Sequence, residues 1–206
     1  MLLYDAAVSG NCYKVRLLLT QLGLPFERVE MDLRGGATRT PRFLALNPRH
    51  QVPVLQWPDG QVLAESNAIL FHLADGSRYL PDDSFRQGQV LQWMFFEQYS
   101  HEPYIAVVRS WHRYGLVDQH RAELDGKVQA GYEALGVMEQ HLRSRAFFVG
   151  DRYSVADIAL YAYTHVAEEG KFELARFPAI RAWLARVAAE PRHVPITAEV
   201  GTPVIW

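Results

Sequence analysis

Cysteine is scarce in this sequence: Cys12 is the only one among 206 residues. A single cysteine forms neither an internal disulfide nor a cysteine-rich zinc site, so a secreted disulfide framework is excluded. An excess of basic residues is also missing, because 21 lysine and arginine residues are set against 23 acidic ones and the formal net charge is −2. Proteins that bind nucleic acids or anionic membranes carry a positive surplus, so we expect neither partner.

Long apolar runs are absent as well. No stretch reaches the roughly 18 consecutive apolar residues that a membrane-spanning helix needs. The first residues, MLLYDAAVSG, lack the basic and apolar regions of a signal peptide. We therefore expect a cytoplasmic protein. Hydrophobic residues still make up 49% of the chain and charged residues 21%, which is typical of a globular protein with a sizeable core.

The first part of the chain alternates between strand-like and helix-like segments. Short apolar runs predict strands, and apolar residues at helical spacing predict helices. In chain order, the expected elements are a strand at 2–6, a helix at 11–23, a strand at 26–31, a helix at 41–47, a hairpin formed by 52–56 and 61–64, and a helix at 66–74. The turn sequence Pro58-Asp59-Gly60 joins the hairpin strands. This order predicts a small α/β domain.

The second part of the chain shows helical patterns and no convincing strand. Residues 76–86 are rich in Gly, Pro, Asp and Ser and form a linker candidate. Helices are expected at 87–113, 118–143, 154–169 and 178–189, with a bend near Pro103 because proline removes an internal hydrogen bond. We thus expect two domains, residues 1–77 and residues 87–206, while the docking of the apolar tail GTPVIW is left undetermined.

A first candidate site lies between the first strand and the first helix, at Ser9-Gly10-Asn11-Cys12. A helix N-terminus offers unpaired N–H groups and the positive end of a dipole, and a hydroxyl there can hydrogen-bond a thiolate. The spacing matches a C-x-x-C redox motif whose first cysteine is replaced by Ser9. The plain alternative is that Ser9 only caps the helix and Cys12 packs beneath it as a small apolar residue.

A second candidate site is the segment His50-Gln51-Val52-Pro53, at the start of a predicted strand. A cis Val52–Pro53 bond would turn the N–H and C=O of Val52 outward, where they could pair with an extended, peptide-like ligand. An ordinary trans proline that opens an edge strand is the alternative.

A third candidate site is Glu65-Ser66-Asn67, where a strand leads into a helix. Free N–H groups at the helix start, with the Ser66 hydroxyl, suit a carboxylate, and Glu65 suits an ammonium. Together they fit the head group of an amino acid, although a routine helix cap explains the same residues.

The last motif, Ser154-Val155-Ala156-Asp157, is interpreted as structural. Ser at the N-cap and Asp three residues later form a variant of the capping box, and Tyr153 and Ile158 occupy the hydrophobic-staple positions.

In this order and at these spacings, the four motifs resemble the cytosolic glutathione transferase family over essentially the whole chain. The resemblance is to a bacterial-type member with a serine-type active-site segment. It implies an α/β plus all-α fold, with an N-terminal thioredoxin-like domain followed by a C-terminal helical-bundle domain. It also implies attack of the glutathione thiolate on hydrophobic electrophiles, a role in detoxification, and glutathione as co-substrate with no further cofactor.

The resemblance also implies roles for individual residues. Ser9 would stabilise the glutathione thiolate, with Asn11 as its rival; Tyr4 is interpreted as structural. The implied glutathione-binding residues are Arg39, His50, Gln51, Val52, Pro53, Glu65, Ser66 and Asn67. For the glycyl carboxylate, the sequence leaves the choice between Arg39 and Arg49 open.

The helical domain would hold the hydrophobic substrate, at Tyr104, Val108, Trp111 and Tyr114. Helix core or a subunit interface is the alternative for each of them. No metal site is expected, since no H-x-E or HExxH pattern is present. Family members are usually homodimers, and Glu97 or Glu102 is expected to reach the glutathione of the neighbouring subunit. Two other functions remain open: a glutathione-dependent disulfide reductase or peroxidase, and a non-catalytic ligand-binding protein.

Overall fold

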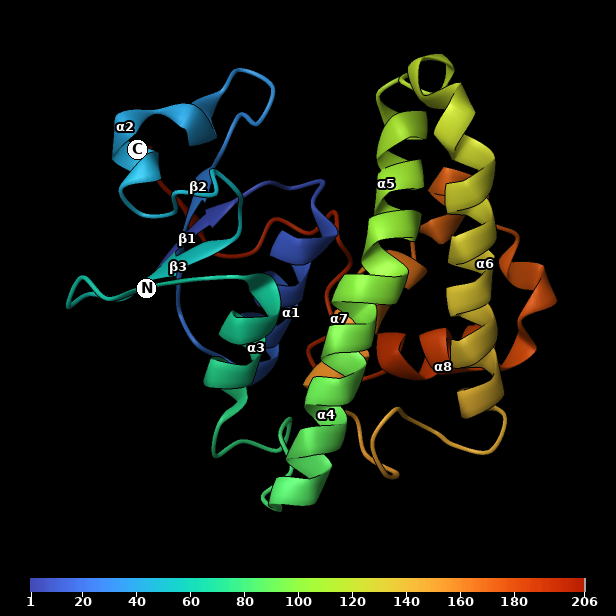
Figure 1. The fold of residues 1–206 in the computed structure, drawn as a ribbon. Helices are drawn as coiled ribbons and strands as arrows, with labels where there is room; N and C mark the ends of the chain where they lie inside the picture. The colour runs from blue at the N-terminus through green and yellow to red at the C-terminus, as the bar shows by residue number, and fades with distance from the viewer. Residues whose placement is uncertain (206) are drawn as a thin grey trace. The chain divides into compact units, whose positions relative to one another are not determined.

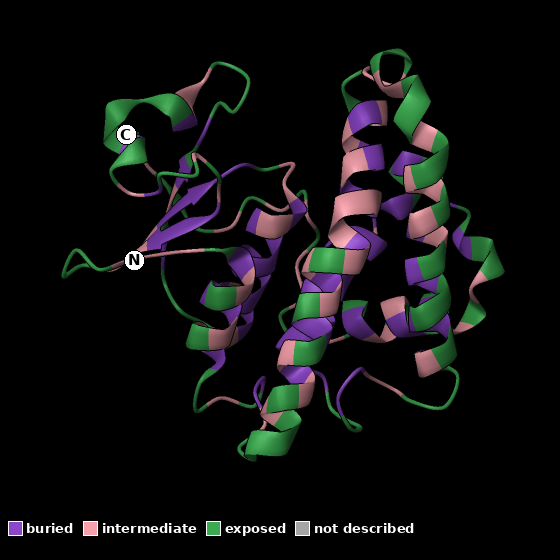
Figure 2. Cartoon of the chain, viewed as in Figure 1, coloured by how far each residue is buried: buried purple, intermediate pink, exposed green. Residues whose placement is uncertain are grey.

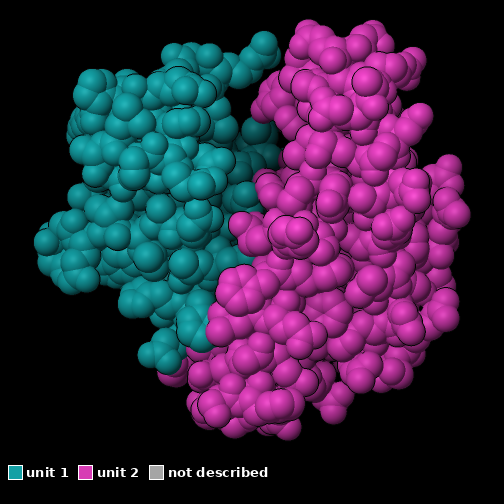
Figure 3. Space-filling view, viewed as in Figure 1, with its two compact units in different colours: residues 1–75, 191–206 teal, residues 76–190 magenta. Residues whose placement is uncertain are grey.

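The computed structural model describes residues 1–205. The chain forms two compact units (Figure 3). The first unit comprises residues 1–75 together with the C-terminal segment that starts at Pro191, and the second comprises residues 76–190.

A five-stranded mixed sheet organises the first unit, with strand order β4-β3-β1-β2-β5. The strands are β1 (Leu2–Asp5), β2 (Glu27–Glu30), β3 (Val54–Gln56), β4 (Val62–Ala64) and β5 (Thr202–Pro203). Strand β2 runs parallel to β1 and β5, whereas β3 runs antiparallel to β1 and β4. As the sequence predicts, the chain turns between β3 and β4 at Pro58-Asp59-Gly60. Gly60 has a φ of 88° there.

Side chains that alternate along the strands give the sheet two apolar faces. On one face Leu3 and Leu55 pack with residues of α1 (Gly10–Leu22) and α3 (Ser66–Ala74), two helices that lie side by side in Figure 1. On the other face Tyr4 and Val54 pack with Phe43 of the short helix α2 (Pro41–Leu44). A mixed sheet covered by helices on both faces confirms the thioredoxin-like domain.

The ends of α1 carry clear sequence signals. Ser9 is its N-cap, and Gly23 ends it in the left-handed conformation at φ 71°, where its N–H reaches the carbonyls of the last turn. Helix α3 matches the predicted range, while α1, α2 and the strands are shorter or shifted by a few residues from their expected ranges.

The second unit is helical, which confirms the predicted helical domain. It contains α4 (Ser84–Phe96), α5 (Glu102–Arg113), α6 (Arg121–Leu142), α7 (Val155–Thr164) and α8 (Pro178–Ala188). The expected helix at 87–113 is two helices joined by a π-helical stretch, Glu97–His101, which ends two residues before Pro103. Figure 2 shows α6 with exposed residues along one side and buried residues along the other.

Helix α7 forms the centre of this unit. All its residues are buried, and it packs against α4, α5 and α8. The capping box is present: the N–H of Ser154 donates to Oδ2 of Asp157 at 2.9 Å. Oδ1 of Asp157 also accepts hydrogen bonds from the indole of Trp183 at 2.9 Å and the N–H of Phe148 at 3.1 Å. The structural interpretation of this motif is confirmed.

The division of the chain differs from the expected domains of 1–77 and 87–206. The segment from Pro191 onward leaves the helical unit and adds β5 beside β2, with the N–H of Val204 donating to the carbonyl of Arg28 at 2.9 Å. In the same segment, the carbonyl of Ile196 accepts a hydrogen bond from the guanidinium of Arg16 at 3.1 Å. Both contacts join residues far apart in sequence, so no local sequence pattern predicts them. Within residues 1–205, none of the helices is long and apolar enough to cross a membrane.

Candidate active site

Ser9 lies at the start of α1, half-buried, and directly follows the turn that leaves β1. Its backbone is extended, at φ −78° and ψ 124°, and its Oγ accepts a hydrogen bond from the N–H of Cys12 at 3.3 Å. This bond uses a lone pair of the oxygen, so the hydroxyl proton is not consumed by the cap. Ser9 therefore caps the helix and retains the capacity to donate.

Cys12, by contrast, is fully buried beneath the same turn. Burial raises the pKa of its thiol well above the usual value, and the nearby Asp5 carboxylate raises it further. A buried, protonated thiol is a poor nucleophile. Tyr4 is also buried and donates from its hydroxyl to Gln56 at 3.1 Å. The burial of both residues agrees with their structural interpretation.

The segment before β3 is held by a residue that sequence reasoning did not single out. The buried amide of Asn47 donates to the carbonyl of Gln51 at 2.9 Å and accepts from the N–H of Arg49 at 3.1 Å. His50 lies between the two residues that Asn47 bonds and has a positive φ of 48°. The signal for Asn47 was an asparagine just before a turn, where its side chain commonly bonds the backbone two residues on.

The Val52–Pro53 peptide bond is cis. Pro53 is buried, whereas Gln51 is exposed and Val52 is half-buried. Within residues 1–205, neither the N–H nor the C=O of Val52 takes part in a hydrogen bond. The backbone of Val52 thus keeps one donor and one acceptor for a ligand.

Glu65 occupies the junction between β4 and α3 in a strained backbone conformation, with φ 69° and ψ 112°. Residues other than glycine rarely adopt positive φ, and such residues cluster at functional sites. The Glu65 side chain is exposed, and its Oε1 lies 3.7 Å from Nε of Arg49. Arg49 also donates to Gln51 at 3.3 Å.

The starts of α1 and α3 meet in one hydrogen-bonded cluster. The hydroxyl of Ser66 donates to Oδ1 of Asn11 at 3.2 Å. The ammonium of Lys14 donates to Oγ of Ser66 and to Oδ1 of Asn67, each at 3.3 Å. Lys14 was not among the expected site residues. Its sequence signal was a lysine between Tyr13 and Val15 in the predicted helix.

Arg39 is the other arginine considered for the glycyl carboxylate. It ends a short 3₁₀ turn, Ala37–Arg39, and is exposed. Its side chain forms no ion pair within the described part of the chain, whereas Arg49 is paired with Glu65. Of the two arginines considered for a carboxylate, Arg49 is the one that the structure brings next to another expected site residue.

The four residues expected to bind a hydrophobic substrate do not share one exposed surface. Val108 and Trp111 are buried, Tyr104 is half-buried and Tyr114 is 37% exposed. Trp111 stacks on His120 with ring centroids 4.3 Å apart, and the ammonium of Lys127 lies 5.5 Å from the ring centroid of Tyr104. Because its side chain is fully buried, Val108 lies in the core. The sequence pattern did not separate the two possibilities, since an apolar position of an amphipathic helix can face either the interior or a ligand.

Glu97, one of two acidic residues expected to reach a neighbouring subunit, is fully buried in the π-helical stretch. A side chain in the interior cannot extend to another subunit, so the prediction for Glu97 is wrong. Glu102 is half-buried.

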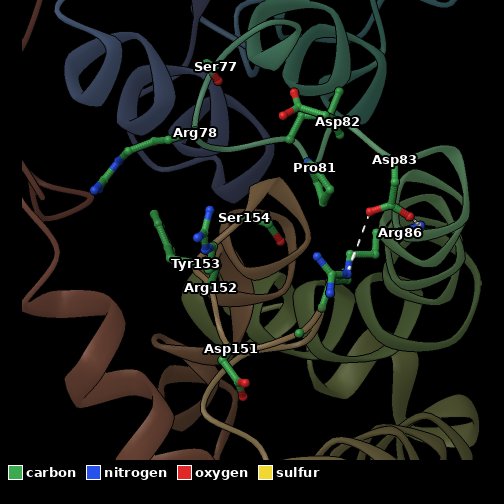
Figure 4. Close-up of a pocket in the computed structure, with 13 residues that line it drawn as sticks. Ser77, Arg78, Pro81, Asp82, Asp83, Arg86, Asp151, Arg152, Tyr153 and Ser154 are labelled. Carbon is green, nitrogen blue, oxygen red and sulfur yellow. Dashed lines mark hydrogen bonds and ion pairs between the residues drawn. The ribbon is translucent and has the colours of Figure 1, made fainter.

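The second unit also contains a cavity of about 500 Å³ (Figure 4). It lies between the segment 77–86 and the loop 149–154, and its charged lining residues are Arg78, Asp82, Asp83, Arg86, Asp151 and Arg152. Arg78 is paired with Glu190 at 2.9 Å and Arg86 with Asp83 at 3.7 Å. None of the expected substrate-binding residues lines this cavity. In the described residues no cluster of three or more His, Cys, Asp or Glu side chains is arranged to hold a metal.

Family models match both units. Residues 8–75 match the glutathione S-transferase N-terminal domain, and residues 92–191 match the glutathione S-transferase C-terminal domain. The first match covers Ser9, the cis Val52–Pro53 bond and the start of α3.

Solved structures and a curated relative extend these matches over nearly the whole chain. A glutathione S-transferase from Pseudomonas fluorescens Pf-5 is 54% identical, with a TM-score of 0.94 over 96% of this chain and 98% of that one. A glutathione transferase from Burkholderia graminis, with two glutathione molecules bound per subunit, is 30% identical, with a TM-score of 0.83 over 93% of this chain and 84% of that one. The disulfide-bond oxidoreductase YfcG of Escherichia coli K12 is 25% identical over 90% of this chain and 89% of its own length. From its two domain matches and its 54% identity to a solved member, the chain belongs to the glutathione S-transferase family.

Proposed function

We propose that this protein is a glutathione transferase that joins the glutathione thiolate to hydrophobic electrophiles. The observation that carries the proposal is the cluster at the starts of α1 and α3, which places hydroxyl and amide groups beside two helix N-termini. Helix N-termini favour negative charge, and here the two charges to be held are a thiolate and a carboxylate.

In the proposed complex, the backbone of Val52 pairs with the cysteinyl part of glutathione, because its N–H and C=O are not engaged elsewhere in residues 1–205. The backbone N–H groups at Ser66 and Asn67 bind the γ-glutamyl carboxylate, and Glu65 binds the ammonium. The remaining proposed contacts, around the cysteinyl and glycyl parts, are Pro53, His50, Gln51 and either Arg39 or Arg49.

For the chemical step, Ser9 or Asn11 donates a hydrogen bond to the sulfur and so stabilises its ionised form. The thiol proton passes to solvent, and the sulfur attacks the electrophilic carbon. A carbon–sulfur bond forms while the bond to the leaving group breaks with its electron pair. Cys12 has no part in these steps, since its thiol is buried.

The test compares wild type with Ser9→Ala and Asn11→Ala, using glutathione and a chlorodinitrobenzene. The variant that removes the main donor should slow conjugation by about 10- to 1000-fold, the scale for losing one positioned donor at a developing charge, with glutathione affinity largely kept. Glu65→Ala should instead weaken glutathione binding in titration calorimetry. A wild-type protein that binds no glutathione contradicts the proposal.

A second candidate function, glutathione-dependent reduction of disulfides or peroxides, is favoured by the similarity to the E. coli disulfide-bond oxidoreductase. The two are separated by assaying a mixed disulfide and an organic hydroperoxide beside the aryl halide. A protein that binds glutathione but turns over none of these substrates would be the third alternative, a non-catalytic ligand-binding member.

The remaining parts of the proposal concern the partner and setting. Tyr104 and Tyr114 are the accessible members of the expected hydrophobic site and contact the electrophile. The protein acts as a homodimer in detoxification. We assign it to the cytoplasm, whose glutathione pool is largely reduced.

A further inference from the structure

Lys127 is a half-buried cation of α6 that the proposed function does not use. Its ammonium donates to the carbonyl of Pro103 at 3.3 Å, and within residues 1–205 this is its one hydrogen bond. A lysine ammonium carries three N–H donors. Two donors of Lys127 are therefore left without a protein acceptor in the described part of the chain.

The positive charge of Lys127 is not neutralised by the acid that its sequence position suggests. Glu123 stands four residues earlier on the same helix, the spacing at which a glutamate and a lysine commonly pair. The Glu123 carboxylate instead lies 3.2 Å from Nδ1 of His120. Across residues 1–205, the Lys127 ammonium forms no ion pair with any carboxylate.

Two aromatic side chains of α5 flank the same ammonium. Its nitrogen lies 5.5 Å from the ring centroid of Tyr104 and 5.9 Å from that of Trp111. The two rings stand seven residues apart, about two helical turns, so they project from the same side of α5. Aromatic faces attract a cation at this distance but carry no net charge. They hold the ammonium in place and leave its charge without a counter-ion.

Tyr104 is the accessible member of this arrangement. Trp111 is buried, and its ring stacks on His120 with centroids 4.3 Å apart. Tyr104 is half-buried, and in residues 1–205 its hydroxyl forms no hydrogen bond. A molecule that packs on the Tyr104 side chain therefore lies beside an ammonium 5.5 Å from the centre of that ring. An anionic group on such a molecule finds a counter-ion there, and a neutral group does not.

We propose that Lys127 is a specificity-determining residue, which selects aromatic electrophiles that carry a carboxylate. The inference rests on the proposed function, in which Tyr104 contacts the electrophile. The apolar part of the substrate packs on Tyr104, while its carboxylate accepts hydrogen bonds from the two remaining donors of Lys127. Partly buried charges are screened less than exposed ones, so this ion pair adds to the binding of the electrophile.

The chemical step is the one already described. With an aryl chloride, the carbon–sulfur bond forms, chloride leaves with the electron pair of its bond, and the thiol proton passes to solvent. The carboxylate stays intact and only binds Lys127. A change at Lys127 should therefore act on KM for the electrophile more than on kcat.

The test uses a chlorodinitrobenzoate, with its carboxylate opposite the chlorine, and the corresponding amide, which has nearly the same shape and no charge. Because their intrinsic reactivities differ, each probe is compared between wild type and variant. In Lys127→Met, kcat/KM for the benzoate should fall about tenfold, mainly through KM, the scale of one lost hydrogen bond between charged groups. The loss for the amide should not exceed about twofold. Lys127→Arg, which keeps the charge, should retain the benzoate rate within about threefold.

Equal losses for the two probes in Lys127→Met, or no loss for either, overturn the inference and leave the proposed function intact. The matched control, Lys171→Met, removes the same charge from an exposed position of the second unit and should alter the rate with neither probe. If Lys127→Met does not fold, Lys127→Gln keeps a donor for Pro103 without the charge. It should show the same selective loss, and a retained benzoate rate in that variant also overturns the inference.

Binding without turnover separates this inference from the proposed function. Titration calorimetry with naphthoate and naphthamide needs no reaction with glutathione. Wild type should bind naphthoate about tenfold more tightly than Lys127→Met does, while the affinity for naphthamide changes by less than about twofold. A wild type that conjugates neither aryl chloride contradicts the proposed function, whereas a naphthoate affinity that does not depend on Lys127 overturns the inference.

Discussion

At the scale of single residues, the one thiol of the sequence is buried. Cys12 lies beneath the first turn of α1 with its N–H bonded to Ser9, and burial raises the pKa of its thiol. Ser9 stands where a C-x-x-C motif has its reactive cysteine. The nucleophilic sulfur is therefore expected to come from glutathione rather than from the protein.

This arrangement predicts that Cys12→Ala keeps the conjugation rate within about threefold of wild type, at a stability cost of about 1 kcal/mol for the small cavity. In native protein, a thiol-reactive chromophore at pH 8 should label no cysteine within minutes. In denaturant it should label one per chain. Rapid labelling of the native protein, or loss of activity on labelling, contradicts the assignment.

The sequence identified most residues of the proposed site but not those that arrange them. Ser9, Val52, Glu65 and Ser66 stand in local motifs that can be read from neighbouring residues. Lys14 meets Ser66 across 52 positions of sequence, and such a contact depends on how two helices lie on the sheet. A local motif predicts which chemical groups a residue can contribute to a site. Which residue it contacts depends on how the helices and strands pack.

At the scale of elements, a buried ion pair joins β1 to α1. Arg16 is 1% exposed and pairs with the fully buried Asp5. Its guanidinium also donates to the carbonyls of Ala7 at 3.0 Å and Ile196 at 3.1 Å. One side chain therefore connects the first strand, the first helix and the C-terminal segment.

Removing this arginine should destabilise the first unit. In Arg16→Leu the carboxylate of Asp5 stays buried, and its remaining ion-pair partner among the described residues is Arg28, 3.6 Å away. We expect a loss of about 3–5 kcal/mol in unfolding free energy. Urea unfolding followed by circular dichroism measures it. The control Arg181→Leu, at an exposed position, should change stability by less than about 0.5 kcal/mol; equal effects of the two would refute the role of Arg16.

Helix α7 provides a pH-dependent element in the second unit. Burial raises the pKa of Asp157 from 3.8 to about 6, although bonds from Trp183, Phe148 and Ser154 oppose the shift. Between these two values the folded state binds more protons than the unfolded state. The contribution of Asp157 to stability therefore falls as pH rises from about 4 to about 6.

The comparison of wild type with Asp157→Asn tests this sign. Asparagine does not titrate, so the free energy of unfolding of wild type, relative to the variant, should decrease by up to about 3 kcal/mol between pH 4 and pH 7. Denaturant melts at several pH values give the difference directly. A difference that stays constant with pH, or grows with it, contradicts the raised pKa.

Long elements were predicted better than short ones. The helices of the second unit repeat an apolar pattern over several turns, and the sequence located them, although it merged α4 and α5 into one expected helix at 87–113. Strand β5 has only two residues, Thr202–Pro203, too few to show an alternation. Pro203 also lacks an N–H and therefore fits only an edge strand. Where the edge of the sheet lies depends on how the other strands pair, which the local sequence does not show.

At the scale of the whole molecule, exposed aromatic residues point to self-association. Phe95 and Tyr99 are 68% and 83% exposed and lie four positions apart where α4 runs into the π-helical stretch. Neighbouring exposed aromatic side chains are frequent at protein–protein interfaces. They support the proposed homodimer.

Sedimentation should give about twice the chain mass of 23.5 kDa for the wild type. Phe95→Glu places a charge within the proposed interface and should shift the protein to the monomer mass. Leu33→Glu, which adds the same charge in the first unit, should remain dimeric. A monomeric wild type, or a dimer unaffected by Phe95→Glu, excludes this surface.

The C-terminal segment has a consequence for how the chain is made. The first unit receives its fifth strand and the Ile196 carbonyl only from residues beyond Pro191. While the ribosome is still synthesising the helical unit, β2 therefore has an open edge that can pair with another chain. Translation that stops early would release a protein with every proposed glutathione contact encoded but with its sheet unfinished, and such fragments should aggregate more readily than the full-length product.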